Sequence, residues 1–191
     1  MQIQETEIPG CYVIGGKKIL DHRGWFLKSF SDIDSPIGLF RTRPIAEIFW
    51  TISGKDVARG LHFQTPPYAV DKYVSCITGS ILDIVLDLRC DLPSFGKTVA
   101  VSLSDQQLGN QSVVVPRGCA HGFLSLSNNS IVHYLQTGVF VETHDHGIAI
   151  APYLQEHGYG FTTLLQSARD ESFGDISHFS RFTTNDWLQI S

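Results

Sequence analysis

The residue types with the clearest chemical potential stand in one short stretch of the chain. Positions 59 to 62 read Arg-Gly-Leu-His, and Lys72 follows His62 by ten positions. An imidazole can remove a proton from a carbon beside a carbonyl group, and an ammonium can stabilise the enolate oxygen that forms. The spacing therefore predicts proton-transfer chemistry next to a carbonyl, provided that the fold places both groups in one cavity.

Short strands are the elements that would position these side chains. Apolar, β-branched segments alternate with turn residues such as Gly79-Ser80 and Asn128-Asn129, a spacing typical of an antiparallel sandwich or barrel. We expect strands over Val57–Gln64, Lys72–Thr78, Ile81–Leu88, Thr98–Leu103, Ser112–Val115 and Ile131–Gln136. The tail from about Ser167 is more polar and predicts short helices and loops.

Strand alternation sorts the polar residues, because every second side chain of a strand shares a face. Lys72 should share its face with Val74 and Cys76. Asp83 lies on one face of a strongly apolar strand, which makes it either solvent-facing or part of a polar cavity. His62 should share a face with Ala58, Gly60 and Gln64.

Length and composition predict one soluble globular domain. The chain has 191 residues, of which 42% are hydrophobic and 17% charged, with a net charge of -5. We expect an all-β barrel over about 20–150 and a C-terminal extension over about 151–191. The negative charge argues against nucleic acid or an anionic membrane as the main partner, and no apolar run is long enough to span a bilayer.

The cysteines and the N-terminus bear on the compartment. Four cysteines are scattered without a C-x-x-C pair, which favours free thiols in a reducing compartment. The first ten residues, MQIQETEIPG, have neither the basic nor the apolar region of a signal peptide. Both features predict a cytoplasmic protein.

An ordered set of motifs from Asp21 to Ile150, extended by the region of Asp170, resembles the dTDP-4-dehydrorhamnose 3,5-epimerase family. The resemblance implies a double-stranded β-helix, the cupin jelly-roll barrel. It also implies a homodimer that acts on a nucleotide-diphosphate sugar with a 4-keto-6-deoxy ring, without cofactor or metal. The matching pieces include DHRGWF (21–26), SGKDVARGLHFQ (53–64), PPYAVDK (66–72), GSILDIVLDLR (79–89), LPSFG (92–96), PRGCAHGF (116–123), HYLQT (133–137) and SARD (167–170).

The resemblance also implies roles for individual residues. His62 matches the catalytic base and Asp170 its carboxylate partner, while Lys72 matches the lysine near the carbonyl oxygen. Tyr134 matches the tyrosine that returns a proton from the opposite face of the sugar, which inverts the carbon. The residues expected to bind or surround the substrate are Arg23, Phe26, Lys28, Glu47, Arg59, Asp83, His121 and Phe140.

Several positions depart from the family pattern where the nucleotide is usually held. Lys28 replaces the usual Glu, Glu47 the usual Gln and Phe49 the usual Asn, while Phe140 stands where a second Tyr is frequent. An unmatched buried polar group costs about 1–3 kcal/mol, so such exchanges are not neutral for base recognition. We therefore expect a different mode of base binding, in which Lys28 and Glu47 pair with each other or read another base.

Three alternatives stay open at this point. A sugar 3,4-ketoisomerase on the same scaffold would use similar enolate chemistry. A metal-dependent cupin needs closely spaced histidines with a carboxylate, and only His144-Asp145-His146 has such spacing, in a polar segment where surface histidines are the simpler interpretation. A catalytically silent nucleotide-sugar-binding protein would explain the altered base positions, but retention of His62, Lys72, Tyr134 and Asp170 favours an enzyme.

Overall fold

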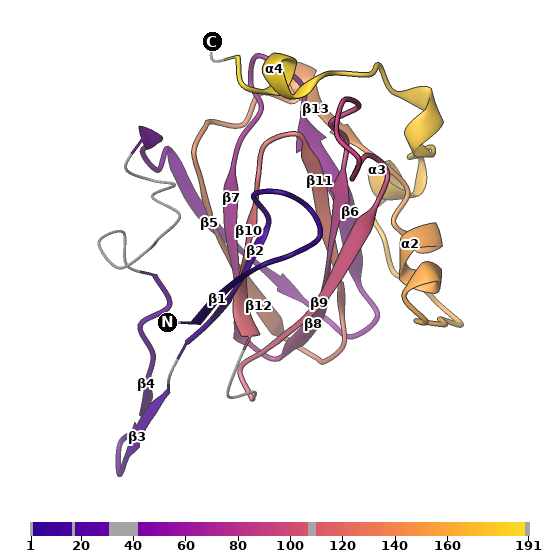
Figure 1. Ribbon diagram of the computed structural model, residues 1–191. Coiled ribbons are helices and arrows are strands. Elements are labelled where there is room, and N and C mark those ends of the chain that lie inside the picture. Colours follow the sequence, from indigo (N-terminus) through magenta and orange to yellow (C-terminus); the bar gives the residue numbers. More distant parts are fainter. Residues whose placement is uncertain (1, 17, 31–41, 107–109, 190–191) are drawn as a thin grey trace.

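Two antiparallel sheets face each other and make up most of the molecule in the computed structural model, which describes residues 2–16, 18–30, 42–106 and 110–189 (Figure 1). The six-stranded sheet has the order β1-β2-β10-β7-β12-β5, and the five-stranded sheet the order β13-β6-β11-β8-β9. A separate hairpin pairs β3 with β4. The strands are β1 (Gln2–Glu5), β2 (Tyr12–Gly15), β3 (Ile19–Asp21), β4 (Gly24–Phe26), β5 (Glu47–Ser53), β6 (Ala58–Gln64), β7 (Lys72–Thr78), β8 (Ser80–Asp87), β9 (Thr98–Ser104), β10 (Asn110–Val115), β11 (Cys119–Ser125), β12 (Ser130–Gln136) and β13 (Asp145–Gly147).

This architecture confirms the predicted all-β, cupin-type jelly-roll barrel. Strand β7 covers the predicted range, and the other predicted strands differ by one or two residues at one or both ends, which is ordinary for element boundaries. The interior between the sheets is apolar and includes Val74, Val85, Phe123 and Val132. The sheets therefore close over a shared core, with the polar cavity described below among their strands.

Strand β8 shows why the barrel needs a second layer. Leu82, Ile84 and Leu86 point to the outer side of the five-stranded sheet, and Ile81 and Val85 point to the barrel interior. All five side chains are buried. Because both faces of the strand are apolar, the outer face must be covered to keep it from water.

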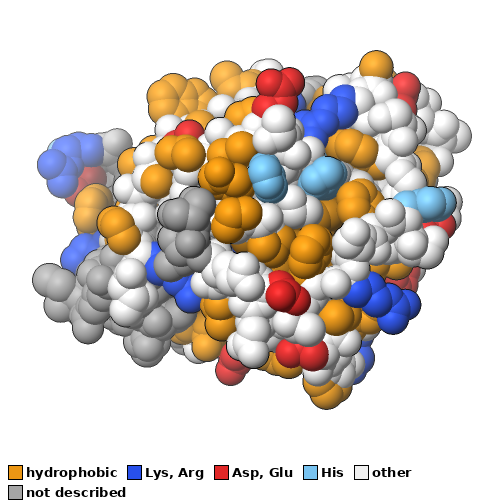
Figure 2. Space-filling model, turned by 90° about the horizontal axis from the view of Figure 1, so that it is seen from above, with side chains coloured by type: hydrophobic (Ala, Val, Ile, Leu, Met, Phe, Trp, Pro, Cys, Tyr) orange, Lys and Arg blue, Asp and Glu red, His pale blue; other side chains and the backbone are white. Residues whose placement is uncertain are grey.

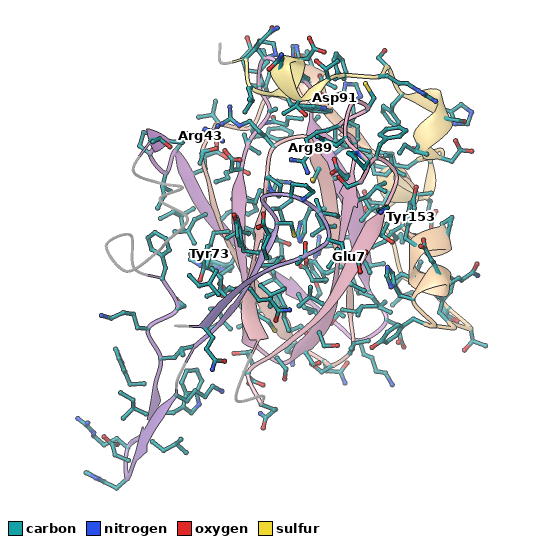
Figure 3. The ribbon with its side chains drawn as sticks, viewed as in Figure 1. Glu7, Arg43, Tyr73, Arg89, Asp91 and Tyr153 are labelled. Carbon is teal, nitrogen blue, oxygen red and sulfur yellow. The ribbon has the colours of Figure 1, made fainter. Side chains whose placement is uncertain are left out.

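The C-terminal extension supplies that cover, as Figure 1 shows in orange and yellow along one side and the top of the barrel. Asp91 accepts hydrogen bonds from the backbone N–H and the hydroxyl of Thr184, and Figure 3 shows Asp91 at the top of the barrel near α4. Trp187 buries its ring in the same layer as Leu86. The elements of the extension are α2 (Ala151–Glu156), α3 (Ala168–Glu171), η2 (Ile176–His178) and α4 (Thr184–Trp187), preceded by η1 (Glu142–His144).

Two surface features bear on partners. The β3–β4 hairpin extends away from the barrel (Figure 1), and it exposes apolar side chains such as Trp25 and Phe26. On the face drawn in Figure 2, basic and acidic side chains are dispersed among hydrophobic ones and histidines, so the described part of that face has no continuous basic surface. Among the described helices, none is long and apolar enough to cross a membrane.

All four cysteines are free thiols, as the sequence predicts. Cys11, Cys76 and Cys119 are buried, and Cys90 is partly exposed. Burial raises the pKa of the Cys11 and Cys76 thiols to about 12, so both are protonated at neutral pH. They act as small apolar side chains in the barrel core.

Candidate active site

A cavity of about 460 Å³ opens among strands of both sheets and contains most of the predicted site. His62 lies on β6 of the five-stranded sheet, whereas Lys72 and Tyr134 lie on β7 and β12 of the six-stranded sheet. A molecule in the cavity would therefore meet His62 from one sheet and Tyr134 from the other. The lining residues are Glu47, Phe49, Thr51, Arg59, His62, Gln64, Val70, Lys72, His121, Gly122, Tyr134, Gln136, Phe140, Asp145 and Arg169.

A bulge in β6 sets which side chains enter the cavity. The strand pairs His62 with His121 and Arg59 with Phe123, so three steps along β6 face two steps along β11. The extra residue brings both Arg59 and His62 to the cavity, although simple alternation places them on opposite faces. Ala58, predicted to share a face with His62, instead packs in the outer apolar layer.

Gly60 makes this bulge sterically possible. It has a positive φ of 101°, a conformation that residues with a Cβ rarely adopt. A Cβ added there would lie 2.7 Å from the backbone oxygen of His121 and 2.9 Å from the Cα of Gly122. The Gly in the Arg-Gly-Leu-His motif therefore has a backbone role.

His62 and Asp170 form a hydrogen-bonded pair, with 2.8 Å between His62 Nε2 and Asp170 Oδ1. Asp170 lies in α3, and its other oxygen, Oδ2, accepts a hydrogen bond from the backbone N–H of Gly60 at 3.0 Å. Burial alone would raise the pKa of Asp170, but the hydrogen bonds from His62 and Gly60 outweigh it and hold that pKa below its usual value. A carboxylate bonded to one ring nitrogen fixes the orientation of the imidazole and leaves the other nitrogen available as a general base.

Lys72 lines the cavity together with two other cationic side chains, Arg59 and Arg169. Its ammonium donates a long hydrogen bond, 3.5 Å, to the backbone oxygen of His62. Desolvation lowers the pKa of Lys72 to about 8, although Asp145 and Asp83 act in the opposite direction. The side chain is therefore mostly charged at pH 7 and suited to stabilise an oxyanion.

Tyr134 is enclosed more tightly than His62. Its ring stacks on that of Phe49, its cross-strand partner on β5, with 4.7 Å between centroids and 11° between planes. Burial and the nearby Asp83 raise the pKa of Tyr134 well above its usual value, so the phenol carries its proton at neutral pH. A protonated phenol on the sheet opposite His62 can act as a general acid.

His121 and Asp83 form a second histidine–carboxylate pair, with 2.8 Å between His121 Nε2 and Asp83 Oδ2. His121 lines the cavity, and its ring meets that of Tyr134 edge to face at 5.9 Å. Asp83 is fully buried and does not line the cavity itself. The sequence left Asp83 either facing solvent or belonging to a polar cavity. Its burial excludes the solvent-facing position.

The predicted substrate-binding residues fall into two groups. Arg59, Glu47 and Phe140 line the cavity, and Glu47 accepts hydrogen bonds from the amide of Gln136 at 2.7 Å and the backbone N–H of Phe140 at 3.1 Å. The second group, which comprises Arg23, Phe26 and Lys28, is exposed on or beside the β3–β4 hairpin and does not line the cavity of its own chain.

The salt bridge of Arg23 is local, and Lys28 is not the partner of Glu47. Arg23, in the turn of the hairpin, pairs with Asp21 two positions earlier at 2.5 Å, with 78% of the arginine side chain exposed. The carboxylate of Glu47 is engaged by Gln136 and Phe140 instead of by Lys28. The expected Lys28–Glu47 pair therefore does not form within one chain.

Sequence reasoning missed Asp145 and Arg169, which line the cavity and form a salt bridge at 2.5 Å. Asp145 stood within the His144-Asp145-His146 segment, but it is the carboxylate and not the histidines that reaches the cavity. The rings of His144 and His146 contact Tyr68 and Phe63 respectively. Among the described residues no cluster of His, Cys, Asp and Glu has the arrangement of a metal site.

Comparisons with known proteins agree with this geometry. A family model described as dTDP-4-dehydrorhamnose 3,5-epimerase matches residues 5–177. The dTDP-4-dehydrorhamnose 3,5-epimerase of Escherichia coli is 36% identical over 148 residues, which cover 78% of this chain and 79% of the relative. The protein of the same name from Sinorhizobium fredii is 31% identical over 179 residues, covering 90% and 88%.

Solved structures give the same result. The dTDP-6-deoxy-D-glucose-3,5-epimerase of Legionella pneumophila, in complex with dTDP-4-keto-L-rhamnose, matches with a TM-score of 0.84 and 28% identity over 94% of each chain. These relatives are isomerases, and the matches span most of the chain. The chain therefore belongs to the dTDP-4-dehydrorhamnose 3,5-epimerase family and is an isomerase by class.

Proposed function

We propose that this chain is a cofactor-independent epimerase of a nucleotide-linked 4-keto-6-deoxyhexose. It inverts carbon 3, carbon 5 or both, the two carbons that flank the ketone. The observation that carries the proposal is the position of His62 and Tyr134 on opposing sheets of one cavity, with Lys72 in the same cavity. Removal of a proton on one side and its return on the other is the minimum that inversion requires.

The catalytic cycle follows from the side chains. His62, oriented by Asp170, takes the proton from the carbon, and the electron pair of the C–H bond moves into the enolate. The ammonium of Lys72 stabilises the negative charge on the ketone oxygen. Tyr134 then gives its phenolic proton to the carbon from the other side. The reaction leaves His62 protonated and Tyr134 deprotonated.

The diphosphate and base of the substrate would bind beside this centre. Arg59 lines the cavity and offers a planar guanidinium, which suits phosphate oxygens. The Legionella pneumophila relative is titled as a complex with dTDP-4-keto-L-rhamnose, which supports a nucleotide sugar as the substrate class. Glu47 and Phe49, where the family usually has Gln and Asn, are the positions that would change how the base is held.

The working unit is a homodimer in this proposal. On edge strand β5, Glu47, Phe49 and Thr51 face the cavity, and the alternate residues Ile48, Trp50 and Ile52 are exposed. Exposed apolar side chains on an edge strand are typical of an interface. A second copy bound against β5 would also bring its β3–β4 hairpin to the cavity. Arg23, Phe26 and Lys28 of that hairpin region would then reach a cavity that lacks them within one chain. The free cysteines favour a reducing compartment such as the cytoplasm.

Deuterium incorporation from heavy water, followed by NMR, tests the proposal. The panel would contain dTDP-, UDP-, CDP- and GDP-linked 4-keto-6-deoxy sugars, with wild type beside His62→Asn and His62→Ala. We expect exchange at carbon 3, carbon 5 or both with at least one substrate, and its loss in both variants without loss of the fold. Exchange that persists in a folded His62 variant would remove the mechanism. A folded wild type without exchange on any substrate would favour a silent binding protein.

A further inference from the structure

The two ends of the proposed proton path differ in their access to water. The side chain of His62 is 30% exposed, and beside it a groove of about 380 Å³ is lined also by Leu165, Ser167 and Asp170. Tyr134 is only 7% exposed and is covered by the stacked ring of Phe49. The base can therefore exchange its proton with water far more readily than the acid can.

This asymmetry creates a problem for repeated turnover. After each inversion His62 holds an extra proton, which it can release to water through the groove. Tyr134 is left as a phenolate in a site where burial and the nearby Asp83 disfavour its charged form. A buried phenolate with poor access to water needs a proton donor inside the protein.

His121 and Asp83 form a histidine–carboxylate pair beside Tyr134 and can serve as such a proton donor. Asp83 Oδ2 lies 2.8 Å from His121 Nε2, and the other oxygen, Oδ1, is buried without a hydrogen-bond partner among the described residues. With Nε2–H donated to Asp83, the other ring nitrogen, Nδ1, can hold or release a proton while that hydrogen bond is kept. The His121 ring reaches Tyr134 edge to face at 5.9 Å and lines the same cavity.

We propose that the His121–Asp83 pair is an internal proton store that reprotonates Tyr134 after each inversion. The inference rests on the proposed function and assigns a specific step to a pair that the sequence predicts only to bind or surround the substrate. The N–H bond at His121 Nδ1 breaks, directly or through one water in the cavity, and the O–H bond of Tyr134 forms. The electron pair stays on Nδ1, and Nε2–H stays hydrogen-bonded to Asp83. His121 Nδ1 takes up a new proton from water when product leaves the cavity.

The charged groups around His121 define what each variant changes. Asp83 faces it from β8, Tyr134 from β12 and His62 from the paired position on β6. The negative charge of Asp83 also acts on Lys72, so an Asp83 variant alone would alter two groups. His121→Asn removes the store and keeps the Asp83 charge, which makes it the necessary second variant.

The test compares exchange with inversion in Asp83→Asn and His121→Asn. Exchange in heavy water needs His62 and the Lys72 cation but not Tyr134, whereas net inversion needs a fresh proton on Tyr134 at every turnover. In His121→Asn we expect exchange within about threefold of wild type, one inversion per site at a near-normal rate, and later inversions slowed about 10–100-fold. In Asp83→Asn exchange and the first inversion should both fall through the change at Lys72, but later inversions should again be slower than the first. Rapid-quench kinetics would show the fast first inversion as a burst that precedes the slower later inversions.

The matched control is Asp87→Asn, a buried aspartate on the same face of β8 that pairs with Arg89 at 2.7 Å. It should destabilise the fold without changing the ratio of exchange to inversion. Equal loss of exchange and inversion in Asp83→Asn and His121→Asn, without a burst, would assign the pair a structural role and overturn the proposal. Unchanged inversion would overturn it as well. A wild type that exchanges no substrate would instead refute the proposed function.

Discussion

Lys72 shows how a single residue links the cavity to pH. Its pKa of about 8 lies below the usual lysine value because the cavity desolvates the ammonium. The cation is therefore present below pH 8 and is lost as the pH rises through 8. Since the proposed enolate intermediate would need that cation, we predict that kcat/KM falls above about pH 8, approaching tenfold per pH unit.

A pH–rate profile of wild type beside Lys72→Arg checks this prediction. Arginine stays charged across this pH range. The fall in the rate of the variant should therefore begin at a higher pH than in wild type, even if its absolute rate is lower. An alkaline limb at the same pH in both proteins would mean that another group controls it.

The sequence predicts some of the residues that line the cavity and misses others. His62, Lys72 and Tyr134 each carry a distinctive side chain within a motif, and all three line the cavity. Asp145 and Arg169 escaped notice because their salt bridge spans 24 positions and depends on the pairing of β13 with β6. No local pattern encodes such a contact.

At the scale of the element, the bulge in β6 is the feature on which the cavity depends. Gly60→Ala would place a Cβ against the backbone of His121 and force a positive φ on alanine. We predict a loss of about 1–3 kcal/mol in the free energy of unfolding, together with reduced activity as His62 shifts. Denaturant unfolding and steady-state rates measure the two effects.

The control for this substitution is Gly54→Ala, because that glycine has open space around the added Cβ. Gly54→Ala should change the free energy of unfolding by much less than Gly60→Ala does. A Gly60→Ala protein as stable and active as wild type would show that the bulge does not need glycine.

The contrast between β8 and β6 explains what periodicity can predict. In β8, Ile81, Asp83 and Val85 lie on one face as alternation requires, because the strand pairs regularly with both neighbours. In β6 one extra residue interrupts the register, so alternation fails between Arg59 and His62. Bulges arise from contacts between strands, and only the Arg-Gly pair hints at this one.

At the scale of the whole molecule, the proposed dimer makes a direct prediction. Trp50 is 66% exposed on the outer face of β5, and a charge there would oppose burial against a second copy. Trp50→Glu should shift the protein from a dimer to the monomer mass of 21.2 kDa in light scattering. Activity should fall with it, because the β3–β4 hairpin of the second copy would leave the cavity.

Leu188→Glu serves as the matched control, since Leu188 is also exposed but belongs to the C-terminal extension. It should remain dimeric and active. A monomeric wild type, or a fully active monomer of Trp50→Glu, would contradict the dimer and the role of the hairpin together. The barrel itself is predictable from strand and turn spacing, whereas in the proposed dimer the position of the hairpin would depend on contacts with a second copy.

The central claim is that His62 removes a proton and Tyr134 returns one on the other side. The most direct measurement follows both events in heavy water by NMR, comparing wild type with Tyr134→Phe on a substrate that wild type inverts. The variant should still exchange the carbon-bound proton through His62 but keep the original configuration. Equal loss of exchange and inversion in a folded variant would contradict the assignment of Tyr134 as the opposite-face acid.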